Sequence, residues 1–348
     1  MAISPRAAFG ASIAVLASAL LLAACGSSSS TDATTAADAG GSITVYSGRE
    51  AEYMEPVFEA YEKKTGTDLQ VRYGDSADLA LLISEEGERS PADVFLAQSP
   101  ISQSYLDQKS LLSPLPTAVL DRVPENLRAA DGDWVGIAGR QRVLIYNTDL
   151  LKESDLPKSV LELTNAKYRD KVAVAPSNAS FQDFVAALDQ LEGTETTNEW
   201  LKGMAANGTK VYAKNSAIAE AVARGEIPMG LVNHYYVLEI KEDDPSAPVA
   251  AYRFPGTDPG SLFLVATASV PEASPDKQQA DDLVGFLVSD EGQKIIIGGE
   301  GEYPTVTGVN PPEGAPSLAK GDYPAYDLTG KTDLKAVAEQ IRESGLAQ

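Results

Sequence analysis

The sequence predicts an α/β fold of two lobes joined by a two-strand hinge. Short β-rich runs alternate with amphipathic helical runs in two separate parts of the chain, a pattern typical of parallel α/β units. Two long β-like runs flank the second unit, WVGIAGRQRVLIYN (134–147) and RFPGTDPGSLFLVATASV (253–270). The chain is therefore expected to leave the first lobe, build the second and return, which brings two loop-rich faces together.

The first α/β unit begins at Ser42 with the strand ITVYSG (43–48). The segment EAEYMEPVFEAYEKKTG (50–66) has the apolar spacing of a helix, and its last glycine ends that helix. A strand LQVRYG (69–74), a helix around 77–86 and a strand PADVFLAQ (91–98) follow. This βαβαβ order predicts parallel pairing.

The second unit repeats this alternation after residue 146. Its elements are, in order, the strand KVAVAPS (171–177), the helix SFQDFVAALDQL (180–191), the strand TKVYAK (209–214), the helix SAIAEAVARG (216–225) and the strand PMGLVN (228–233). A helix of the type DKQQADDLVGFLVSDEGQKII (276–296) comes after the second long β-like run. The predicted lobes are 42–140 with 268–348, and 141–267.

The amino end is predicted to be an export signal rather than part of the fold. Residues 1–25 carry a single charge, Arg6, and an apolar stretch (11–22) too short to span a bilayer comfortably. The following LAACG resembles the lipobox of bacterial lipoproteins, so Cys25 is the expected lipid anchor to the outer face of the cytoplasmic membrane. Residues 26–41, rich in Ser, Thr, Ala and Gly, are expected to form a flexible tether.

Composition excludes several classes of protein. The formal net charge of −22 argues against nucleic acid as a partner, because phosphate backbones need a basic surface. With Cys25 as the only cysteine, the mature chain has no intrachain disulfide and no cysteine-based metal site. We expect a monomer stabilised by packing.

Two adjacent tyrosines are the most informative local feature. Tyr235 and Tyr236 lie in LVNHYYVLEI (231–240), where a strand gives way to a helix. Adjacent side chains of a strand point to opposite faces, so both phenols reach one ligand only if the backbone turns at this junction. The alternative is that one or both rings pack in the core with satisfied hydroxyls.

Several segments together resemble one family. They are ITVYSGR, SPADVF, GRQRVLIYNTDLL, KNSAIAEAVARGEIPMGLVNHYY and GEYPTV. In this combination they are similar to the ferric-ion-binding subfamily of the type 2 periplasmic-binding-protein fold, the solute-binding component of ABC importers. The resemblance covers the chain from Ser42 to about Asn310 and implies an iron receptor, not an enzyme.

The resemblance implies a set of iron ligands. It assigns phenolate ligands to Tyr235 and Tyr236, and a third phenol to Tyr146 in RVLIYN. Fe³⁺ is a hard cation that prefers anionic oxygen, and its charge favours deprotonation of a phenol. Glu50 stands where the family often has histidine, and its carboxylate suits a hard cation as well. Gln98, where relatives carry glutamate, is expected to be a bystander.

A synergistic anion, carbonate or phosphate, often completes the iron shell in this family. The break between strand and helix at PSNASF offers free amides and a helix dipole to such an anion. Guanidinium groups match carbonate and phosphate geometry, although each arginine could instead form an ion pair. The candidate anion-binding residues are Asn178, Ala179, Ser180, Asn215, Asn233, Arg49 and Arg142.

The expected mechanism is capture of Fe³⁺ by closure of the lobes, followed by release to a membrane permease that works with its ATPase. His234, between Asn233 and Tyr235, is expected to point away from the ion. The same fold also binds other cargo, such as sugars, polyamines, thiamine or anions. A sugar site would present several aromatic platforms, whereas only Trp134 and Trp200 are available.

A secreted hydrolase is the remaining alternative. It would need an acid and a base in a cleft. The sequence has neither a GxSxG nor an HExxH motif, and it has a single histidine. Binding is therefore expected rather than catalysis.

Overall fold

One β-sheet runs through both halves of the protein. The computed structural model describes residues 41–315, 318, 321–327 and 333–347, which belong to one compact unit (Ala39–Gln348). The predicted signal peptide with Cys25, and the tether up to residue 40, lie outside the described residues. The strand order is β2-β1-β3-β10-β5-β8-β6-β7, with β4 paired to β10 and β9 paired to β5.

The strands are β1 (Ser42–Ser47), β2 (Asp68–Tyr73), β3 (Val94–Ala97), β4 (Leu112–Ser113), β5 (Trp134–Asn147), β6 (Val172–Val174), β7 (Lys210–Val211), β8 (Met229–Asn233), β9 (Val249–Tyr252) and β10 (Phe263–Pro271). The α-helices are α1 (Ala51–Thr65), α2 (Ser76–Glu86), α3 (Pro100–Asp107), α4 (Thr117–Leu120), α5 (Ala179–Glu192), α6 (Thr194–Ala206), α7 (Asn215–Ala223), α8 (Tyr235–Asp243), α9 (Lys277–Leu287), α10 (Asp290–Glu300) and α11 (Leu334–Glu343).

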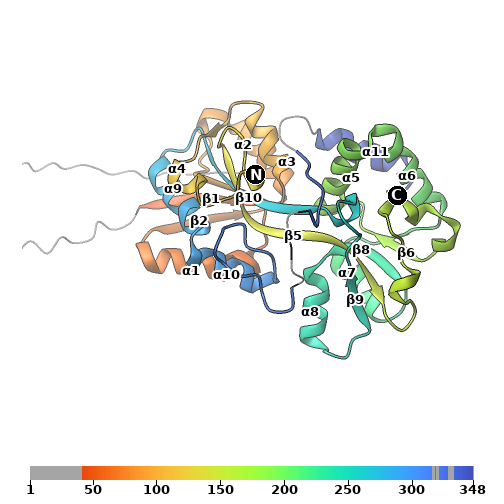
Figure 1. Cartoon of the computed structure of the whole chain (residues 1–348). Helices are drawn as coiled ribbons and strands as arrows, with labels where there is room; N and C mark the ends of the chain where they lie inside the picture. Colours follow the sequence, from red (N-terminus) through yellow and green to blue (C-terminus); the bar gives the residue numbers. More distant parts are fainter. Residues whose placement is uncertain (1–40, 316–317, 319–320, 328–332, 348) are drawn as a thin grey trace, which may run out of the picture. The chain divides into compact units, whose positions relative to one another are not determined.

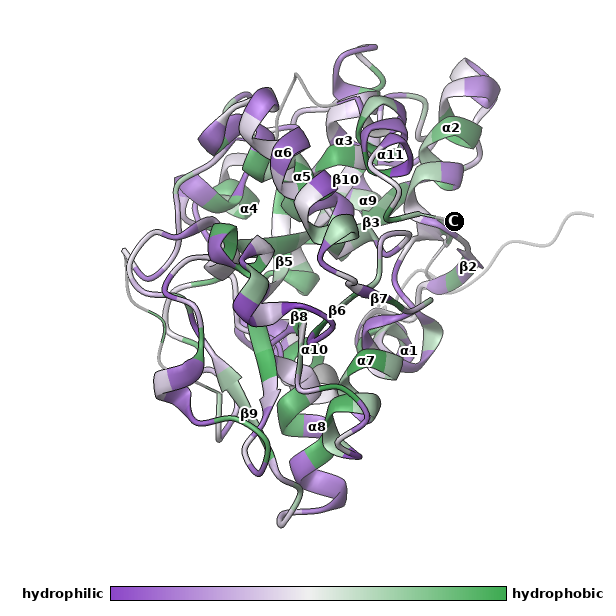
Figure 2. Ribbon diagram, turned by 90° about the vertical axis from the view of Figure 1, so that its right-hand side faces the viewer, coloured by the Kyte–Doolittle hydropathy of each residue, from purple (hydrophilic) through white to green (hydrophobic). Residues whose placement is uncertain are grey.

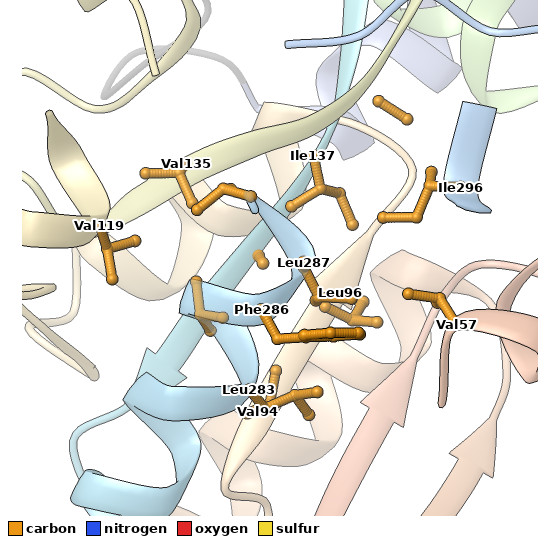
Figure 3. Packing of buried hydrophobic residues seen from close by; sticks show 14 of the residues in the cluster. Val57, Val94, Leu96, Val119, Val135, Ile137, Leu283, Phe286, Leu287 and Ile296 are labelled. Atoms are coloured by element: carbon orange, nitrogen blue, oxygen red, sulfur yellow. The ribbon is translucent and has the colours of Figure 1, made fainter. Parts of the chain in front are cut away.

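The first half is built on the parallel pairs β1–β2 and β1–β3, as the βαβαβ pattern predicts. Helix α1 ends at Gly66, whose left-handed conformation (φ 79°) lets its N–H bond back to Glu62. The apolar face of α1, with Met54, Val57 and Phe58, is buried. Figure 3 shows this core, in which Val57, Leu96 and Val135 from the first half meet Leu283, Phe286 and Ile296 from the returning chain.

The second half is built on the parallel pairs β6–β8 and β6–β7. Its two cores lie on either side of these strands. One contains the aromatic group Phe181, Phe184 and Trp200, and the other is centred on Ile218 and Val232. A second α/β unit was predicted from the alternation after residue 146, and it is present.

Strands β5 and β10 join the two halves. They pair with each other in antiparallel fashion from Phe263–Gln141 to Ser269–Trp134, with a shift in register after Ala266. At one end β10 pairs with β3, and at the other β5 pairs with β8 and β9. Figure 1 shows both strands passing between the two groups of helices. The predicted fold class, two α/β lobes joined by two strands, is therefore confirmed.

The structure differs from the expected elements in two places. The β-like run of 253–270 is regular only from Phe263, because Pro255, Gly256 and Pro259 interrupt the ladder that its first part would need. The single expected helix of 276–296 is divided into α9 and α10, because the Ser289 side chain caps a new helix by accepting a bond from the Gly292 N–H.

The carboxyl end also departs from the expected lobe boundary. Helix α11 packs against α5, and its Val337 and Ile341 belong to the core of the second half. The predicted assignment of 268–348 to the first lobe therefore does not describe α11.

The helices are amphipathic. Figure 2 shows hydrophobic and hydrophilic stretches alternating along α8, which covers its sheet with Val237 and leaves charged residues outside. Within the described part of the chain, every helix is too short or too polar to cross a bilayer.

Candidate functional site

The two tyrosines lie at the start of a helix. Asn233 ends β8, and Tyr235 and Tyr236 are the first residues of α8. His234, which lies between Asn233 and Tyr235, already has helical backbone angles (φ −58°, ψ −36°), so the chain turns within two residues. The two phenol rings lie side by side, with centroids 4.5 Å apart and planes at 43°. The turn that two adjacent phenols need is therefore present.

Asn233 connects Tyr235 to the rest of the site. Its Nδ2 donates to the Tyr235 hydroxyl oxygen (3.1 Å) and to Oγ of Ser180 on α5 (3.2 Å). Its Oδ1 accepts a bond from Nη1 of Arg142 on β5 (3.0 Å). All four side chains are buried. The Tyr235 oxygen thus receives a hydrogen bond, which stabilises a phenolate more than a phenol.

The starts of helices α5, α7 and α8 converge around this group. The Asn178 side chain caps α5 by accepting the Ser180 N–H (3.0 Å), and it also accepts Nδ2 of Asn215, the first residue of α7 (3.1 Å). Oδ1 of Asn215 is buried and has no hydrogen-bond partner. Helix N-termini carry partial positive charge, so these three helix starts favour an anion between them.

Arg142 adds a full positive charge. Its guanidinium is buried and is bonded to Asn233 and to the Leu231 carbonyl oxygen (3.0 Å) rather than to a carboxylate. Burial lowers the pKa of Arg142 to about 10, while Tyr236 and Tyr235 act in the opposite direction. Arg142 therefore remains charged near neutral pH and lies within electrostatic reach of both phenols.

On the other side, Arg49 holds the loop that carries Glu50. Both Arg49 and Glu302 are buried, and two bonds of 2.7 and 3.3 Å join them. The ion-pair alternative considered for Arg49 is thus the arrangement in the structure. Glu50 itself is exposed at the start of α1. Its carboxylate is therefore accessible to an incoming cation.

The start of α1 faces α8. Burial, followed by the neighbouring Glu52 carboxylate, raises the pKa of Glu239 on α8 to about 7. Glu52 belongs to the first turn of α1, two residues after Glu50. The first turn of α1, which Glu50 precedes, is therefore within electrostatic reach of the helix that bears the tyrosines.

Comparison with known proteins identifies the family. A model of the family described as bacterial extracellular solute-binding protein matches residues 57–324. The chain belongs to this family. Solute-binding proteins of this kind are extracytoplasmic transport receptors rather than enzymes.

The relatives of this solute-binding protein include named iron-binding proteins. The "Major ferric iron-binding protein" of Neisseria meningitidis is 33% identical over 311 residues, covering 87% of this chain and 93% of the relative. The "Fe(3+)-binding periplasmic protein" of Serratia marcescens is 32% identical over 337 residues, covering 96% of this chain and 97% of the relative.

Solved structures extend the similarity to the fold. Iron-bound HitA from Pseudomonas aeruginosa superimposes with a TM-score of 0.82 at 32% identity, covering 87% of this chain and 99% of the other. A Trichodesmium protein, IdiA (FutA), in complex with iron and citrate ligands gives a TM-score of 0.77 at 26% identity, covering 88% and 100%. The type 2 fold that the sequence resemblance implied is thus confirmed.

In this solute-binding protein Tyr146 is separated from the tyrosine pair. In the pairing of β5 with β8, Arg142 lies opposite Asn233 and Tyr146 lies opposite Met229. Tyr146 is therefore four residues from Arg142 along β5, which is roughly 13 Å in a strand. It packs in a core of the second half. Burial, with a smaller contribution from Glu153, raises the pKa of its phenol, which disfavours a phenolate. The structure therefore does not bring Tyr146 to the expected ligand set.

Gln98 is joined to the hinge through its backbone. Its carbonyl oxygen accepts a bond from Arg140, which also lies 3.9 Å from Asp183 of α5. Burial raises the pKa of Asp183 to about 7. Arg140 and Asp183 are both buried. Neither was predicted from the sequence, because no local pattern marks their contacts with Gln98 and with each other.

The contacts of the GEYPTV segment were also not predicted from the sequence. Tyr303 stacks on the His234 ring, with centroids 4.4 Å apart and planes at 25°. Burial raises the pKa of Tyr303 to about 12 and lowers that of His234 to about 4, so both stay uncharged near neutral pH. The only local signal for these contacts is the GEYPTV motif itself.

Proposed function

We propose that this protein is an extracytoplasmic receptor that binds Fe³⁺ and delivers it to an ABC importer. The observation that carries the proposal is the pair of phenols at the first two positions of α8, whose rings lie side by side and of which Tyr235 accepts a hydrogen bond from Asn233. The ferric-binding proteins among its relatives support the same cargo.

Tyr235 and Tyr236 would bind the ion as phenolates. Ferric ion is a hard cation, and anionic oxygen is the ligand type it prefers. The start of α8 and the Arg142 guanidinium both stabilise negative charge at this position. Glu50 would add a carboxylate from the facing half. We leave Tyr146 out of the ligand set because of its place on β5.

A synergistic anion would complete the shell in the cradle formed by the starts of α5 and α7. The backbone N–H of Ala179 at the start of α5, the side chains of Ser180, Asn178, Asn215 and Asn233, and the charge of Arg142 suit carbonate or phosphate. Arg49 would take part only by leaving Glu302. The citrate in the Trichodesmium structure supports a carboxylate-type partner for iron in this fold.

Delivery would depend on the two halves moving about β5 and β10. In this proposal the closed form holds Fe³⁺, and docking on the permease favours an open form, a shift of population between two arrangements. Acylation at Cys25 would keep the receptor at the membrane surface. The support for this anchor is the LAACG sequence after a short apolar stretch.

A sugar cargo has less support. Both tryptophans are buried in cores, Trp134 near Phe263 and Trp200 against Phe184. Neither is available as a platform on which a sugar ring could stack. The polar groups gathered around Asn233 instead match a charged ligand.

The test is a visible spectrum of the purified protein mixed with ferric citrate, together with metal analysis. We expect a coloured complex from tyrosinate-to-iron charge transfer. The double variant Tyr235→Phe/Tyr236→Phe should lose the colour and tight binding. Tyr146→Phe is the matched control, since it removes one buried phenol oxygen far from the pair.

Each outcome has a clear meaning. A colourless wild-type mixture without iron uptake would exclude this cargo. A coloured double variant would remove the two phenols from the ligand set. Loss of colour in Tyr146→Phe would restore that residue as a ligand and contradict the position found for it.

A further inference from the structure

His234 stands between Asn233 and Tyr235, yet it does not cap α8 with its side chain. It is 1% exposed, and each ring nitrogen has a backbone partner. The Gln141 N–H donates to Nδ1 (3.3 Å), and Nε2 faces the Gly301 carbonyl oxygen (3.1 Å). Because a carbonyl oxygen only accepts, the proton is assigned to Nε2, and this neutral tautomer satisfies both contacts.

The backbone of His234 is held by the same strand. Its N–H donates to the Gln141 carbonyl oxygen (2.9 Å), so Gln141 of β5 fixes both the main chain and the ring of His234. The start of α8 is thereby tied to the strand that joins the two halves. A ring held at two nitrogens and at its own backbone has little rotational freedom.

The third partner is the connector segment, defined here as Gly301–Tyr303. Tyr303 stacks on the His234 ring at 4.4 Å. Tyr303 and Gly139 of β5 exchange two backbone bonds of 2.8 and 2.7 Å, which fix the segment against the hinge. Glu302, the middle residue of the connector segment, forms an ion pair with Arg49, which directly precedes Glu50.

The connector segment therefore touches both sides of the proposed iron site. On one side it holds the loop of Glu50 through Arg49, and on the other it holds His234. The His234 ring meets Tyr235 edge to face, with centroids 5.7 Å apart. Coordination is sensitive to displacements of the order of 1 Å, so a group that fixes the start of α8 controls where the phenols sit.

We propose that His234 is a positioning residue for the iron-binding phenols, acting through Tyr235 and the connector segment without touching the ion. This inference rests on the proposed function. It assigns a role to the only histidine of the chain, which the sequence places beside the tyrosines but which the structure directs toward Gln141, Gly301 and Tyr303.

The experiment compares three variants of the full protein. His234→Phe keeps a ring that can stack on Tyr303 but loses both hydrogen bonds. His234→Gln keeps a donor close to the position of Nε2. Trp200→Phe is the matched control, because it removes one buried ring N–H that donates to a backbone oxygen (Val160, 2.9 Å) in a core away from the site.

The readouts are the position and intensity of the tyrosinate-to-iron band, the rate of iron loss to a chelator, and the melting temperature of the iron-free protein. We expect His234→Phe to shift the band and to speed iron loss about 10- to 100-fold, the range found when a partner that orients a metal ligand is removed. His234→Gln should recover most of the wild-type rate. Trp200→Phe should lower only the melting temperature.

The proposal is overturned if His234→Phe lowers stability but keeps the wild-type band and release rate. Should that variant fail to fold, His234→Asn takes its place, since it keeps an acceptor for the Gln141 N–H and lacks the donor to Gly301. An unchanged band and rate would again overturn the proposal. A colourless wild type would refute the proposed function and this inference with it, whereas a coloured wild type with unaffected variants refutes this inference alone.

Discussion

Replacing Glu302 by alanine should strongly destabilise the iron-free protein. The Arg49 and Glu302 side chains are each 1% exposed, and two contacts of 2.7 and 3.3 Å join them. Glu302→Ala leaves the Arg49 charge buried without its carboxylate. Removing one partner of such a buried pair costs about 3–5 kcal/mol. The same loss should also loosen the loop that carries Glu50.

The assay is urea denaturation of the iron-free protein, which yields the free energy of unfolding. Glu291→Ala is the matched control, because its pair with Lys64 has side chains 53% and 55% exposed and such pairs contribute about 0–1 kcal/mol. The double variant Arg49→Met/Glu302→Leu should recover much of the loss, since no buried charge remains. A loss for Glu302→Ala no larger than that for Glu291→Ala would refute the reasoning.

Two further predictions concern packing and pH. Gly292→Ala should lower the free energy of unfolding by about 1–3 kcal/mol, because its new Cβ would lie 2.1 Å from the Phe286 carbonyl oxygen. In the same helix, the new Cβ of Gly298→Ala meets no atom within 4 Å, so this variant should raise the free energy of unfolding by about 0.5–1 kcal/mol. Equal effects of the two substitutions in urea denaturation would contradict this prediction. Burial raises the pKa of Asp183 from 3.8 to about 7, so the folded state binds its proton more tightly and stability from this group falls as pH rises between those values. The free energy of unfolding of Asp183→Asn, measured relative to that of the wild type by urea denaturation, should therefore be higher at about pH 8 than at about pH 4.5. A difference between variant and wild type that does not depend on pH would argue against a raised pKa of Asp183.

The fold was predictable where the local pattern and the tertiary contacts agree. The apolar spacing of α1 and the glycine that ends it are both local features, so sequence alone located that helix. The division between α9 and α10 was not predictable in this way. The helical spacing of apolar residues continues across residues 276–296. The break depends on one side chain, Ser289, which caps the start of α10 by accepting the Gly292 N–H.

The site was predictable to a similar degree. Tyr235 and Tyr236 are adjacent, so a local motif and the strand-to-helix change were enough to single them out. Tyr146 shares a motif with Arg142, but only the register of β5 on β8 shows that the two lie at different ends of the pairing. Glu302 lies 253 residues from Arg49 in sequence, and no local pattern marks a contact of that separation.

The pairing of β5 with β10 has a consequence for how such a receptor is emptied and refilled. Two paired strands can twist and bend while the backbone hydrogen bonds between them stay intact. The core around Phe286 in the first half and the core around Ile218 and Val232 in the second half need not be exposed during such a movement, because each is formed within one half. If the two halves move about these strands, as proposed, the movement therefore requires no local unfolding of either core.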